Sequence, residues 1–300
     1  MQSLLILGRQ PELGLAELES LYGADKLTRL SPESVVVDVD PCLLAYDRLG
    51  GSTRFCKILT TLTSDNWEEV EDFLVKVSPH QVATMPDGKM YLGISVIGFS
   101  LSPKAIQASG FKIKKSIAKT GRSVRFIPNK ERMLSTPQVI HNKLLSPNGW
   151  ELVVIRSQKQ TVIAQTVKIQ DIEAYSERDY GRPKRDSKVG MLPPKLAQII
   201  INLSVGLLPE ESRQSVCEIP PDQVIPLKHL DQVILDTFCG TGVVLQEAIL
   251  MGYKTYGSDI DERMVEYSRF NINEWLLKNR PDLPSPLRIE LGDATNHRWI

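Results

Sequence analysis

Two motifs in the last third of the chain combine acidic residues and glycines at a spacing suited to binding a nucleoside. The first, at residues 235–242, reads LDTFCGTG, and the second, at residues 256–261, reads YGSDID. Because glycine lacks a Cβ atom, the backbone at Gly240 and Gly242 can pass close to a ligand and take φ values barred to other residues. A helix that begins there presents free N–H groups. Asp259, 23 residues after Asp236, can accept hydrogen bonds from both hydroxyls of a ribose.

The elements that position these residues are predicted to follow a β-α-β order. The apolar pattern indicates a buried strand at Val233–Leu235, a helix at Val243–Met251 and a second strand at Lys254–Gly257. Asp236 then stands at the end of the first strand, where a carboxylate suits the amino group of a methionine moiety. The unit therefore predicts a Rossmann-like fold that binds S-adenosylmethionine.

A dinucleotide site is the main alternative, because it also places glycines after a strand and an acid about 20 residues further on. Its fingerprint requires a third glycine, and Leu245 occupies that position here. Asp236 would also repel a pyrophosphate. The pattern favours S-adenosylmethionine, while an ordinary β-α-β unit whose glycines and acids only form turns stays open as a second alternative.

The composition indicates a globular protein of two or three domains. The chain has 300 residues, of which 42% are hydrophobic and 24% are charged. No apolar run approaches the roughly 18 to 20 residues of a transmembrane helix, and residues 1–8 are too short for a signal peptide. These features predict a cytoplasmic protein that does not contact a membrane.

The cysteines and histidines predict no metal site and no disulfide framework. The four cysteines lack Cys-x-x-Cys spacing, and the four histidines do not cluster with them. The cysteines are Cys42, Cys56, Cys217 and Cys239. Cys239 lies inside the glycine motif, where a small residue that fills the turn is favoured over a nucleophile.

Charge is distributed unevenly although the net charge is zero. Residues 101–190 contain 18 Lys or Arg and 7 Asp or Glu, a net charge of +11, so the rest of the chain carries −11. Such a basic segment is a candidate surface for a polyanion such as nucleic acid. A solvated helix face is the alternative. Further candidate phosphate donors in the segment are Ser116, Thr120, Ser123, Asn129 and Tyr180.

The first 64 residues show a βαββαβ order, which is typical of a ferredoxin-like unit. The predicted elements are a strand at Leu4–Gly8, a helix from Pro11, strands at Asp25–Leu30 and Ser34–Val39, a helix at Cys42–Leu49, and a strand at Phe55–Leu62.

Residues 65–170 form a second predicted α/β module. Its expected elements are helices at Trp67–Lys76 and Ser102–Thr120, strands at Tyr91–Gly98 and Val124–Ile127, a helix capped by Ser135, and a hairpin of Glu151–Ile155 and Thr161–Ile169. Gly110 is a candidate kink in the long helix.

Residues 171–190 form a connector that is predicted to be ordered, because it is rich in charged and aromatic residues rather than in Gly and Ser. Those residues are Tyr175, Arg178, Asp179, Tyr180, Arg182, Lys184 and Arg185. The helix that follows is expected to pack Ile199, Ile200 and Leu203 on the next sheet.

Several of these segments together resemble the THUMP-domain tRNA guanine-N2 methyltransferases. They read ERD at 177–179, RPKRD at 182–186, GMLPPKLA at 190–197 and NL at 202–203, followed by DTFCGTG at 236–242. The resemblance implies an α/β protein with a ferredoxin-like N-terminal domain at 1–64, a THUMP RNA-binding domain at 65–170, a linker at 171–190 and a Rossmann-like class I methyltransferase domain at 191–300. It also implies S-adenosylmethionine-dependent methylation of the exocyclic N2 of a guanosine in tRNA.

The same resemblance implies roles for individual residues. Asp236, Phe238, Gly240 and Gly242 would contact the methionine part of the cofactor, Asp259 the ribose, and Asp293 the adenine amino group. The segment 191–195, which includes Pro194, would cover the methionine end. The tRNA would be held by Lys112, Lys114, Lys115, Lys119, Arg122 and Arg125.

One motif of that family is absent. The family stacks the target base on an (Asp/Asn)-Pro-Pro-(Tyr/Phe) loop, and neither Pro193-Pro194 nor Pro220-Pro221 has the required neighbours. The loop follows soon after the adenine-contacting acid, and Ile300 is only seven residues past Asp293. Catalytic residues are therefore unassigned.

We accordingly expect an incomplete methyltransferase domain with about three of its seven strands. We expect this chain alone to be inactive, and a missing C-terminal segment or a second chain to complete the sheet. Two alternatives stay open: a non-catalytic RNA-binding protein with a vestigial cofactor fold, and a methyltransferase that acts on ribosomal RNA or on adenine in DNA.

Overall fold

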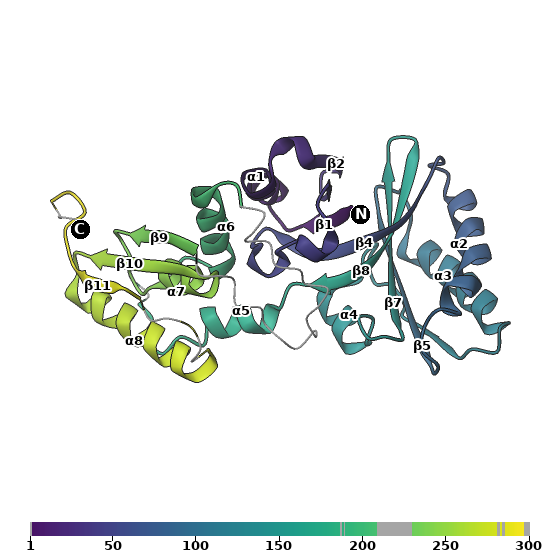
Figure 1. Ribbon diagram of the computed structural model, residues 1–300. Coiled ribbons are helices and arrows are strands. Elements are labelled where there is room, and N and C mark those ends of the chain that lie inside the picture. Colours follow the sequence, from purple (N-terminus) through teal and green to yellow (C-terminus); the bar gives the residue numbers. More distant parts are fainter. Residues whose placement is uncertain are drawn as a thin grey trace. The chain divides into compact units, whose positions relative to one another are not determined.

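The computed structural model describes residues 2–186, 188, 190–208, 230–280, 283 and 286–296, which fall into two compact units (Figure 1). Unit 1 comprises Met1–Arg9, Lys26–Pro41 and Ser52–Gln170, and unit 2 comprises Gln10–Asp25, Cys42–Gly51 and Asp171–Ile300. The N-terminal 51 residues thus contribute to both units. The expected domain limits at residues 64, 170 and 190 stay predictions.

Unit 1 is built on one mixed sheet of eight strands in the order β2-β3-β1-β4-β8-β7-β5-β6. The strands are β1 Ser3–Leu7, β2 Leu27–Ser31, β3 Ser34–Val37, β4 Ser52–Leu62, β5 Met90–Ile97, β6 Val124–Phe126, β7 Gly149–Ser157 and β8 Gln160–Ile169. Neighbours from β2 to β7 pair antiparallel, whereas β5 runs parallel to both β6 and β7. The long strand β4 joins the first three strands to the other half of the sheet.

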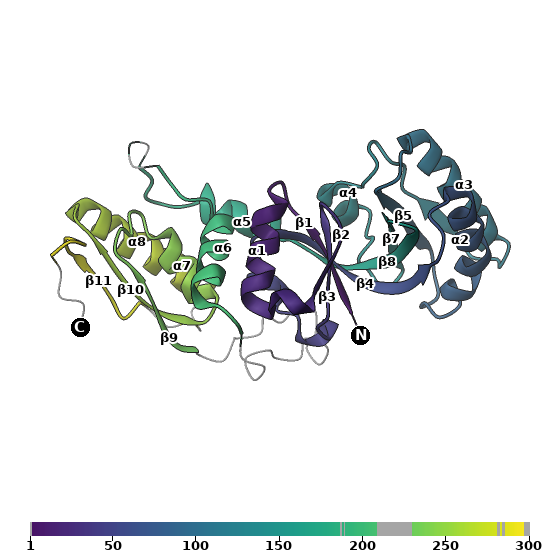
Figure 2. The ribbon, with the colours of Figure 1, turned by 90° about the horizontal axis from the view of Figure 1, so that it is seen from above.

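Helices cover both faces of the β5–β8 half of this sheet. Helices α2 (Trp67–Val82) and α3 (Pro103–Ala118) pack together on one face (Figure 2). Their apolar side chains pack against alternate residues of β5 and β7. The short helix α4 (Thr136–His141) lies on the opposite face and is capped by Ser135, as the sequence predicts. Helix α3 runs through Gly110, where a Cβ would collide with the ring of Phe126, so this glycine allows the close approach of β6.

A buried ion pair links four strands of unit 1. Arg54 on β4 contacts Glu151 on β7, and both side chains are buried. The Glu151 carboxylate also accepts hydrogen bonds from Ser95 Oγ at 2.6 Å and Thr166 Oγ1 at 2.7 Å. The guanidinium of Arg54 donates in addition to the carbonyl of Leu134. The four adjacent strands β4, β8, β7 and β5 therefore each contribute one side chain to a hydrogen-bonded polar cluster.

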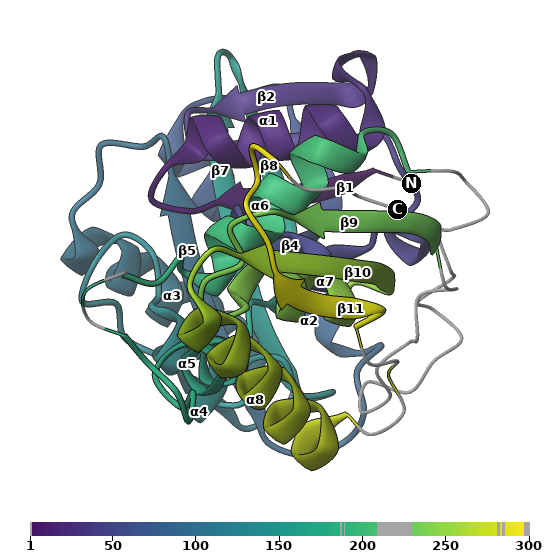
Figure 3. The ribbon, with the colours of Figure 1, turned by 90° about the vertical axis from the view of Figure 1, so that its left-hand side faces the viewer.

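Unit 2 contains a parallel sheet of three strands in the order β11-β10-β9 (Figure 3). Its elements are α1 Pro11–Tyr22, η2 Pro41–Leu43, η3 Tyr46–Arg48, α5 Ile172–Asp179, α6 Pro194–Val205, β9 Leu230–Asp236, α7 Val243–Leu250, β10 Tyr253–Asp259, α8 Glu262–Asn279 and β11 Arg288–Leu291. The β-α-β order expected from the sequence is confirmed.

Helices α6, α7 and α8 lie on one face of this sheet. Leu245 and Ile249 of α7 pack with Ile272 of α8 and Ile289 of β11, and α6 packs on α7. The other face exposes Val233 and Leu235 of β9, which are 49% and 46% accessible. Within the described residues, β9 pairs with β10 alone. Among the described residues, both edge strands of the three-stranded sheet, β9 and β11, therefore pair on one side only, and the face that carries Val233 and Leu235 is partly exposed.

A second buried polar cluster explains why N-terminal residues belong to unit 2. Glu17 of α1 accepts hydrogen bonds from the backbone N–H groups of Gly50 and Gly51, both at 2.9 Å, and from Asn202 Nδ2 at 2.7 Å. Arg48 donates to Asn202 Oδ1 at 2.9 Å and to Tyr253 Oη at 2.7 Å. Burial raises the pKa of Glu17, whereas the hydrogen bonds from Asn202, Gly50 and Gly51 and the charge of Arg48 favour its charged form.

Two predicted elements need correction. Residues Cys42–Leu49 form two short 3₁₀ helices, η2 and η3, instead of one α-helix. The buried residues there are Leu44, Tyr46, Arg48 and Leu49, and in an α-helix Tyr46 would lie on the side opposite to Leu44 and Arg48. In α6, Ile199 is buried as expected but Ile200 and Leu203 are exposed, because polar Gln198 and Asn202 take part in the buried face.

Among the described cysteines, Cys42 is disulfide-bonded, and Cys56 and Cys239 are free thiols. The sequence predicted no disulfide framework and did not indicate the bond at Cys42. Cys217 and Pro220-Pro221 lie outside the described residues. None of the described helices combines the length and apolar character that a membrane span requires.

Candidate functional site

The candidate site lies in unit 2, where β9 and β10 end. Asp236 and Asp259 are the last residues of these two parallel strands, and Asp236 is in register with Gly257. The carboxyl ends of parallel strands meet at one edge of a sheet, so the two acids lie at the same edge. The structure therefore brings together the acids that the sequence singled out.

The glycine turn connects β9 to α7 with left-handed backbone. Gly240 has φ 49° and Gly242, the N-cap of α7, has φ 86°. A Cβ at Gly242 would collide with Ser268 Oγ, whereas one at Gly240 would face open space. Gly242 is therefore required by packing, and Gly240 leaves the backbone accessible to a ligand.

Asp259 ties the two turns together. Its Oδ2 accepts the N–H of Gly240 at 2.9 Å, and its Oδ1 accepts the N–H of Asp261 at 3.0 Å. The side chain is only half-buried, so its remaining lone pairs can accept further hydrogen bonds. This geometry suits a ligand with neighbouring hydroxyl groups.

Asp236 is held in an environment that disfavours its negative charge. Burial is the main cause of its raised pKa, and the nearby charge of Asp259 acts in the same direction, while a hydrogen bond from the N–H of Phe238 at 3.1 Å opposes them. A cationic group of a ligand would relieve this cost. The pair of acids therefore favours a ligand that carries a positive charge.

Each acid is followed by an exposed apolar side chain. Phe238 is 76% accessible and Ile260 is 72% accessible. An exposed aromatic and an exposed aliphatic side chain beside hydrogen-bonding acids suit a ligand with a flat apolar part and a polar part. The sequence reasoning missed Ile260, although its place directly after Asp259 is a usable signal.

Asp293 and Pro194, two further residues predicted to contact the cofactor, lie on other elements of unit 2. Asp293 follows β11, and its Oδ1 accepts the N–H of Thr295 at 2.9 Å and Thr295 Oγ1 at 2.7 Å, which lowers its pKa. The N–H of Gly292 donates to the carbonyl of Asp259 at 3.0 Å, so the third strand end adjoins the second. Pro194 is the buried first residue of α6, and its contact with a ligand stays a prediction.

Cys239 fills the turn, as the sequence analysis favours. It is buried, its N–H donates to the carbonyl of Ser258 at 2.9 Å, and burial raises its pKa to about 12. A thiol in this state is a poor nucleophile. Groups of His, Cys, Asp and Glu able to hold a metal ion are also absent from the described parts of the chain.

The basic residues predicted to bind RNA lie on α3 and around β6 of unit 1. Lys115, Lys119 and Arg125 are exposed and Lys114 is half-buried. Lys112 is paired with Glu71, which raises the pKa of its ammonium group. This set stays a prediction, and Lys112 already has an anionic partner within the protein.

Arg122 has a structural role in unit 1. Its guanidinium donates to the carbonyls of Val82 at 3.0 Å and Gly88 at 3.2 Å, and to Asn148 Oδ1 at 2.9 Å. It therefore holds the segment between α2 and β5. Three other expected phosphate donors, Ser116, Thr120 and Asn129, likewise donate to backbone carbonyls.

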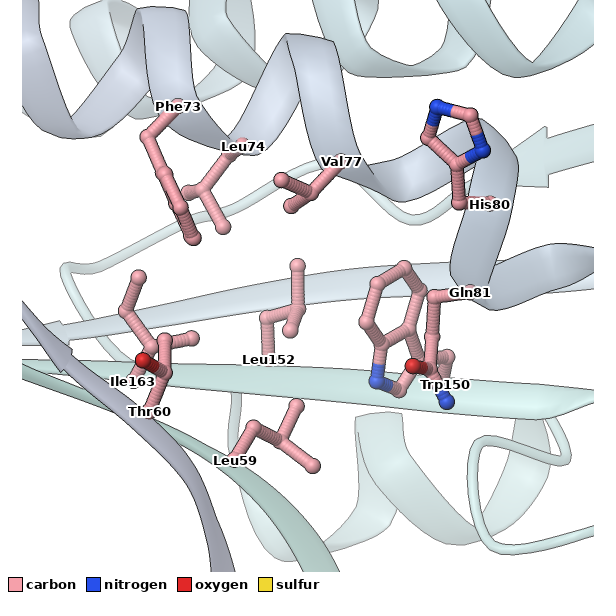
Figure 4. A pocket seen from close by; sticks show the side chains of 10 residues that line it. All are labelled: Leu59, Thr60, Phe73, Leu74, Val77, His80, Gln81, Trp150, Leu152 and Ile163. Carbon is pink, nitrogen blue, oxygen red and sulfur yellow. The ribbon is translucent and has the colours of Figure 1, made fainter.

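Unit 1 also contains a cavity of about 330 Å³ between α2 and the strands β4, β7 and β8 (Figure 4). Ten residues line it: Leu59, Thr60, Phe73, Leu74, Val77, His80, Gln81, Trp150, Leu152 and Ile163. Its walls are mainly apolar, and His80 is the one titratable side chain among them. This lining offers no pair of groups for acid–base chemistry.

Comparisons with known proteins point to one group of enzymes. No protein-family model matches the chain. It is 40% identical over 86 residues to a tRNA (guanine(10)-N2)-dimethyltransferase of Methanothermobacter thermautotrophicus, a match that covers 29% of this chain and 19% of that protein. It is 30% identical over 128 residues to the enzyme of the same name from Pyrococcus abyssi, covering 41% of this chain and 30% of the relative. The matched stretches thus span less than a third of these relatives.

Solved structures show the fold. TrmN from Thermus thermophilus superposes with a TM-score of 0.51 at 14% identity, over 98% of this chain and 74% of that chain. A possible methylase from Clostridium difficile 630 also gives a TM-score of 0.51 at 14% identity, over 99% of this chain and 77% of the other. The mixed α/β fold described above is shared with these two proteins.

Proposed function

We propose that this chain provides the S-adenosylmethionine-binding and RNA-binding parts of a tRNA guanine-N2 methyltransferase. The observation that carries the proposal is the pair Asp236 and Asp259 at neighbouring strand ends, on either side of a turn opened by Gly240. The names of the partial relatives support the same reaction and substrate.

The described residues fit the cofactor in charge and shape. Asp236 would pair with the amino group of the methionine moiety. Burial and the neighbouring Asp259 destabilise its carboxylate form, and a cationic group of the ligand would stabilise that form. Asp259 would accept both ribose hydroxyls, and Asp293 would accept the adenine amino group. Phe238 and Gly240 would line the path of the methionine part, and Pro194 would cover its end.

The reaction needs little from these residues beyond orientation. When bound, S-adenosylmethionine supplies an electrophilic methyl group, and the exocyclic N2 of guanosine would form the new carbon–nitrogen bond. The acids at the strand ends would fix the cofactor in one pose, which is a large part of the catalytic effect in a transfer between two bound groups. Residues that hold the guanine base are not assigned.

Unit 1 would hold the tRNA. The exposed Lys115, Lys119 and Arg125 form the core of the proposed surface, with Lys112, Lys114 and Arg122 beside them. The order β2-β3-β1-β4 supports a ferredoxin-like unit in the first part of the sheet, and the α2–β5–α3–β6 succession supports a THUMP module in the second. Both names remain part of the proposal.

The base-handling loop would come from a further segment of the protein or from a second chain. Support comes from β9, which pairs on one side only within the described residues and exposes Val233 and Leu235. A strand that added to this edge would cover the unpaired backbone groups. A non-catalytic RNA-binding protein that keeps a vestigial cofactor fold is the alternative.

Binding measurements test the proposal. The chain should retain labelled S-adenosylmethionine in equilibrium dialysis, and tRNA should compete better than duplex DNA of equal charge for its basic surface. Replacing Lys115 and Lys119 by Gln should weaken tRNA binding and leave cofactor binding unchanged. Retention of tRNA without any cofactor binding would select the non-catalytic candidate, and preference for duplex DNA would select a DNA substrate.

A further inference from the structure

The connector that precedes the parallel sheet is bound directly to the glycine turn. Arg182 Nη1 donates to the carbonyl of Thr241 at 2.9 Å, and its Nη2 contacts Gln246 Oε1 on α7. Its Nε donates to the carbonyl of Arg178 at 2.7 Å, at the end of α5. The guanidinium therefore joins the end of α5, the turn and the first turn of α7, all within unit 2.

Arg182 is an unusual residue for a connector. It is 5% accessible, and burial lowers its pKa to about 10, so it remains charged at neutral pH. Taking a charged guanidinium out of water is costly unless it is hydrogen-bonded. Each of the three guanidinium nitrogens of Arg182 has a hydrogen-bond partner, so the surrounding structure is built around this side chain.

Asn271 of α8 completes the attachment. Its Nδ2 donates to the carbonyl of Thr241 at 3.1 Å and to that of Lys184 at 2.9 Å, and its Oδ1 accepts the N–H of Lys184 at 2.8 Å. Thr241 is itself buried. Its carbonyl thus has two donors, one from the connector and one from α8, and the peptide group before Gly242 cannot rotate without losing both.

The connector also reaches the second turn of the site. Arg263 bridges Asp186 at 3.1 Å and Asp261 at 3.4 Å, and the N–H of Asp261 is bound by Asp259. Arg178 on α5 pairs with the fully buried Glu247 of α7, with Nε to Oε1 at 2.7 Å. Connector residues therefore brace both turns that carry the candidate ligand-binding groups.

We infer that Arg182 is a positioning residue, which fixes the Thr241 carbonyl and so presets the glycine turn for the cofactor. The inference rests on the proposed function for the identity of the ligand. Arg182 touches no ligand-facing atom and acts through the backbone between Cys239 and Gly242. A preset turn spares the ligand the cost of ordering it, which is the general basis of preorganised binding.

The test compares two buried arginines of unit 2. Arg182→Met removes the donors to Thr241, while the control Arg48→Met removes equally buried donors to Asn202 and Tyr253 that do not touch the turn. Both variants should lower the melting temperature. Only Arg182→Met should weaken S-adenosylmethionine binding, by about tenfold, which corresponds to one well-placed hydrogen bond.

A conservative variant and a measurement on the free protein separate the role of Arg182 in the turn from its effect on overall stability. Arg182→Lys can still donate to the Thr241 carbonyl and should recover a measurable part of the affinity that Arg182→Met loses. Amide hydrogen exchange of the free protein should speed up at Gly240, Gly242 and Val243 in Arg182→Met and stay unchanged in Arg48→Met.

Unchanged exchange at the turn together with unchanged affinity in Arg182→Met would overturn the inference, and so would equal affinity losses in the two Met variants. Failure of the wild-type chain to bind the cofactor would overturn the proposed function instead, while the exchange data would still decide whether Arg182 holds the turn.

Discussion

Replacing Asp259 should affect stability and cofactor binding by amounts that can be separated. In the free protein its carboxylate accepts two backbone N–H groups, from Gly240 at 2.9 Å and from Asp261 at 3.0 Å. Hydrogen bonds to charged groups contribute roughly 1.5 to 3 kcal/mol. Because Asp259 is half-exposed, water can replace much of both bonds, so the lower end of this range applies to the pair, and Asp259→Ala should reduce the free energy of unfolding by about 1.5 kcal/mol.

Cofactor binding should fall further, because the proposed pair of hydrogen bonds to the ribose is also lost. A further loss of roughly 1.5 to 3 kcal/mol corresponds to an affinity reduced by about 10- to 150-fold. Asp259→Asn keeps one oxygen acceptor and the shape of the side chain, so its unfolding free energy should lie between those of the wild type and the Ala variant.

Isothermal titration calorimetry with S-adenosylhomocysteine measures the affinities, and urea unfolding measures the stabilities. Glu262→Ala is the matched control, since Glu262 is an exposed acid three residues further along the chain. It should change neither quantity appreciably. An affinity for Asp259→Ala within twofold of the wild-type value would refute the role assigned to this carboxylate.

Arg54→Met leaves the buried Glu151 without its cation and should cost about 3 to 5 kcal/mol of unfolding free energy. The double replacement Arg54→Met/Glu151→Met should cost far less. Urea unfolding followed by tryptophan fluorescence measures both losses, and equal losses would contradict this prediction. The pKa of Asp236 is raised above 3.8, so between pH 3.8 and the raised value the folded state holds a proton that the unfolded chain has lost, and stability should fall as pH rises through this window. Asp236→Asn should make that decline in melting temperature smaller, while Glu17 and Glu247, whose pKa values are also raised, keep the rest of it, and it should still weaken cofactor binding. Lys115→Gln/Lys119→Gln should lower the slope of log affinity for tRNA against log salt concentration by about 1.5, as expected for two lost phosphate contacts, and an unchanged slope would remove these residues from the surface.

Local sequence signals predicted the strands, turn and helix that carry the candidate site. The strand before Asp236, the glycine turn and the helix after it depend on neighbouring residues, and the acid at 259 is close in sequence. Apolar periodicity likewise predicted most helices and strands of unit 1. The order of the residues along one β-α-β unit thus carries most of the information about where a ligand would lie.

Long-range contacts account for what the sequence did not predict. The segment 42–51 is shaped by Glu17, which binds Gly50 from 33 residues away, and by Asn202, which binds Arg48 from 154 residues away. Its local apolar pattern therefore predicted the wrong type of helix. Asn202 also explains why the buried face of α6 is partly polar. The attachment of Arg182 to Thr241 spans 59 residues and has no signature in the local sequence.

The central claim is that unit 2 binds S-adenosylmethionine and not a dinucleotide. Calorimetric titration of the 300-residue chain with S-adenosylmethionine and, separately, with NAD tests it most directly. The account predicts saturable binding of S-adenosylmethionine at one site and none of NAD. Binding of NAD, or binding of neither ligand, would contradict it.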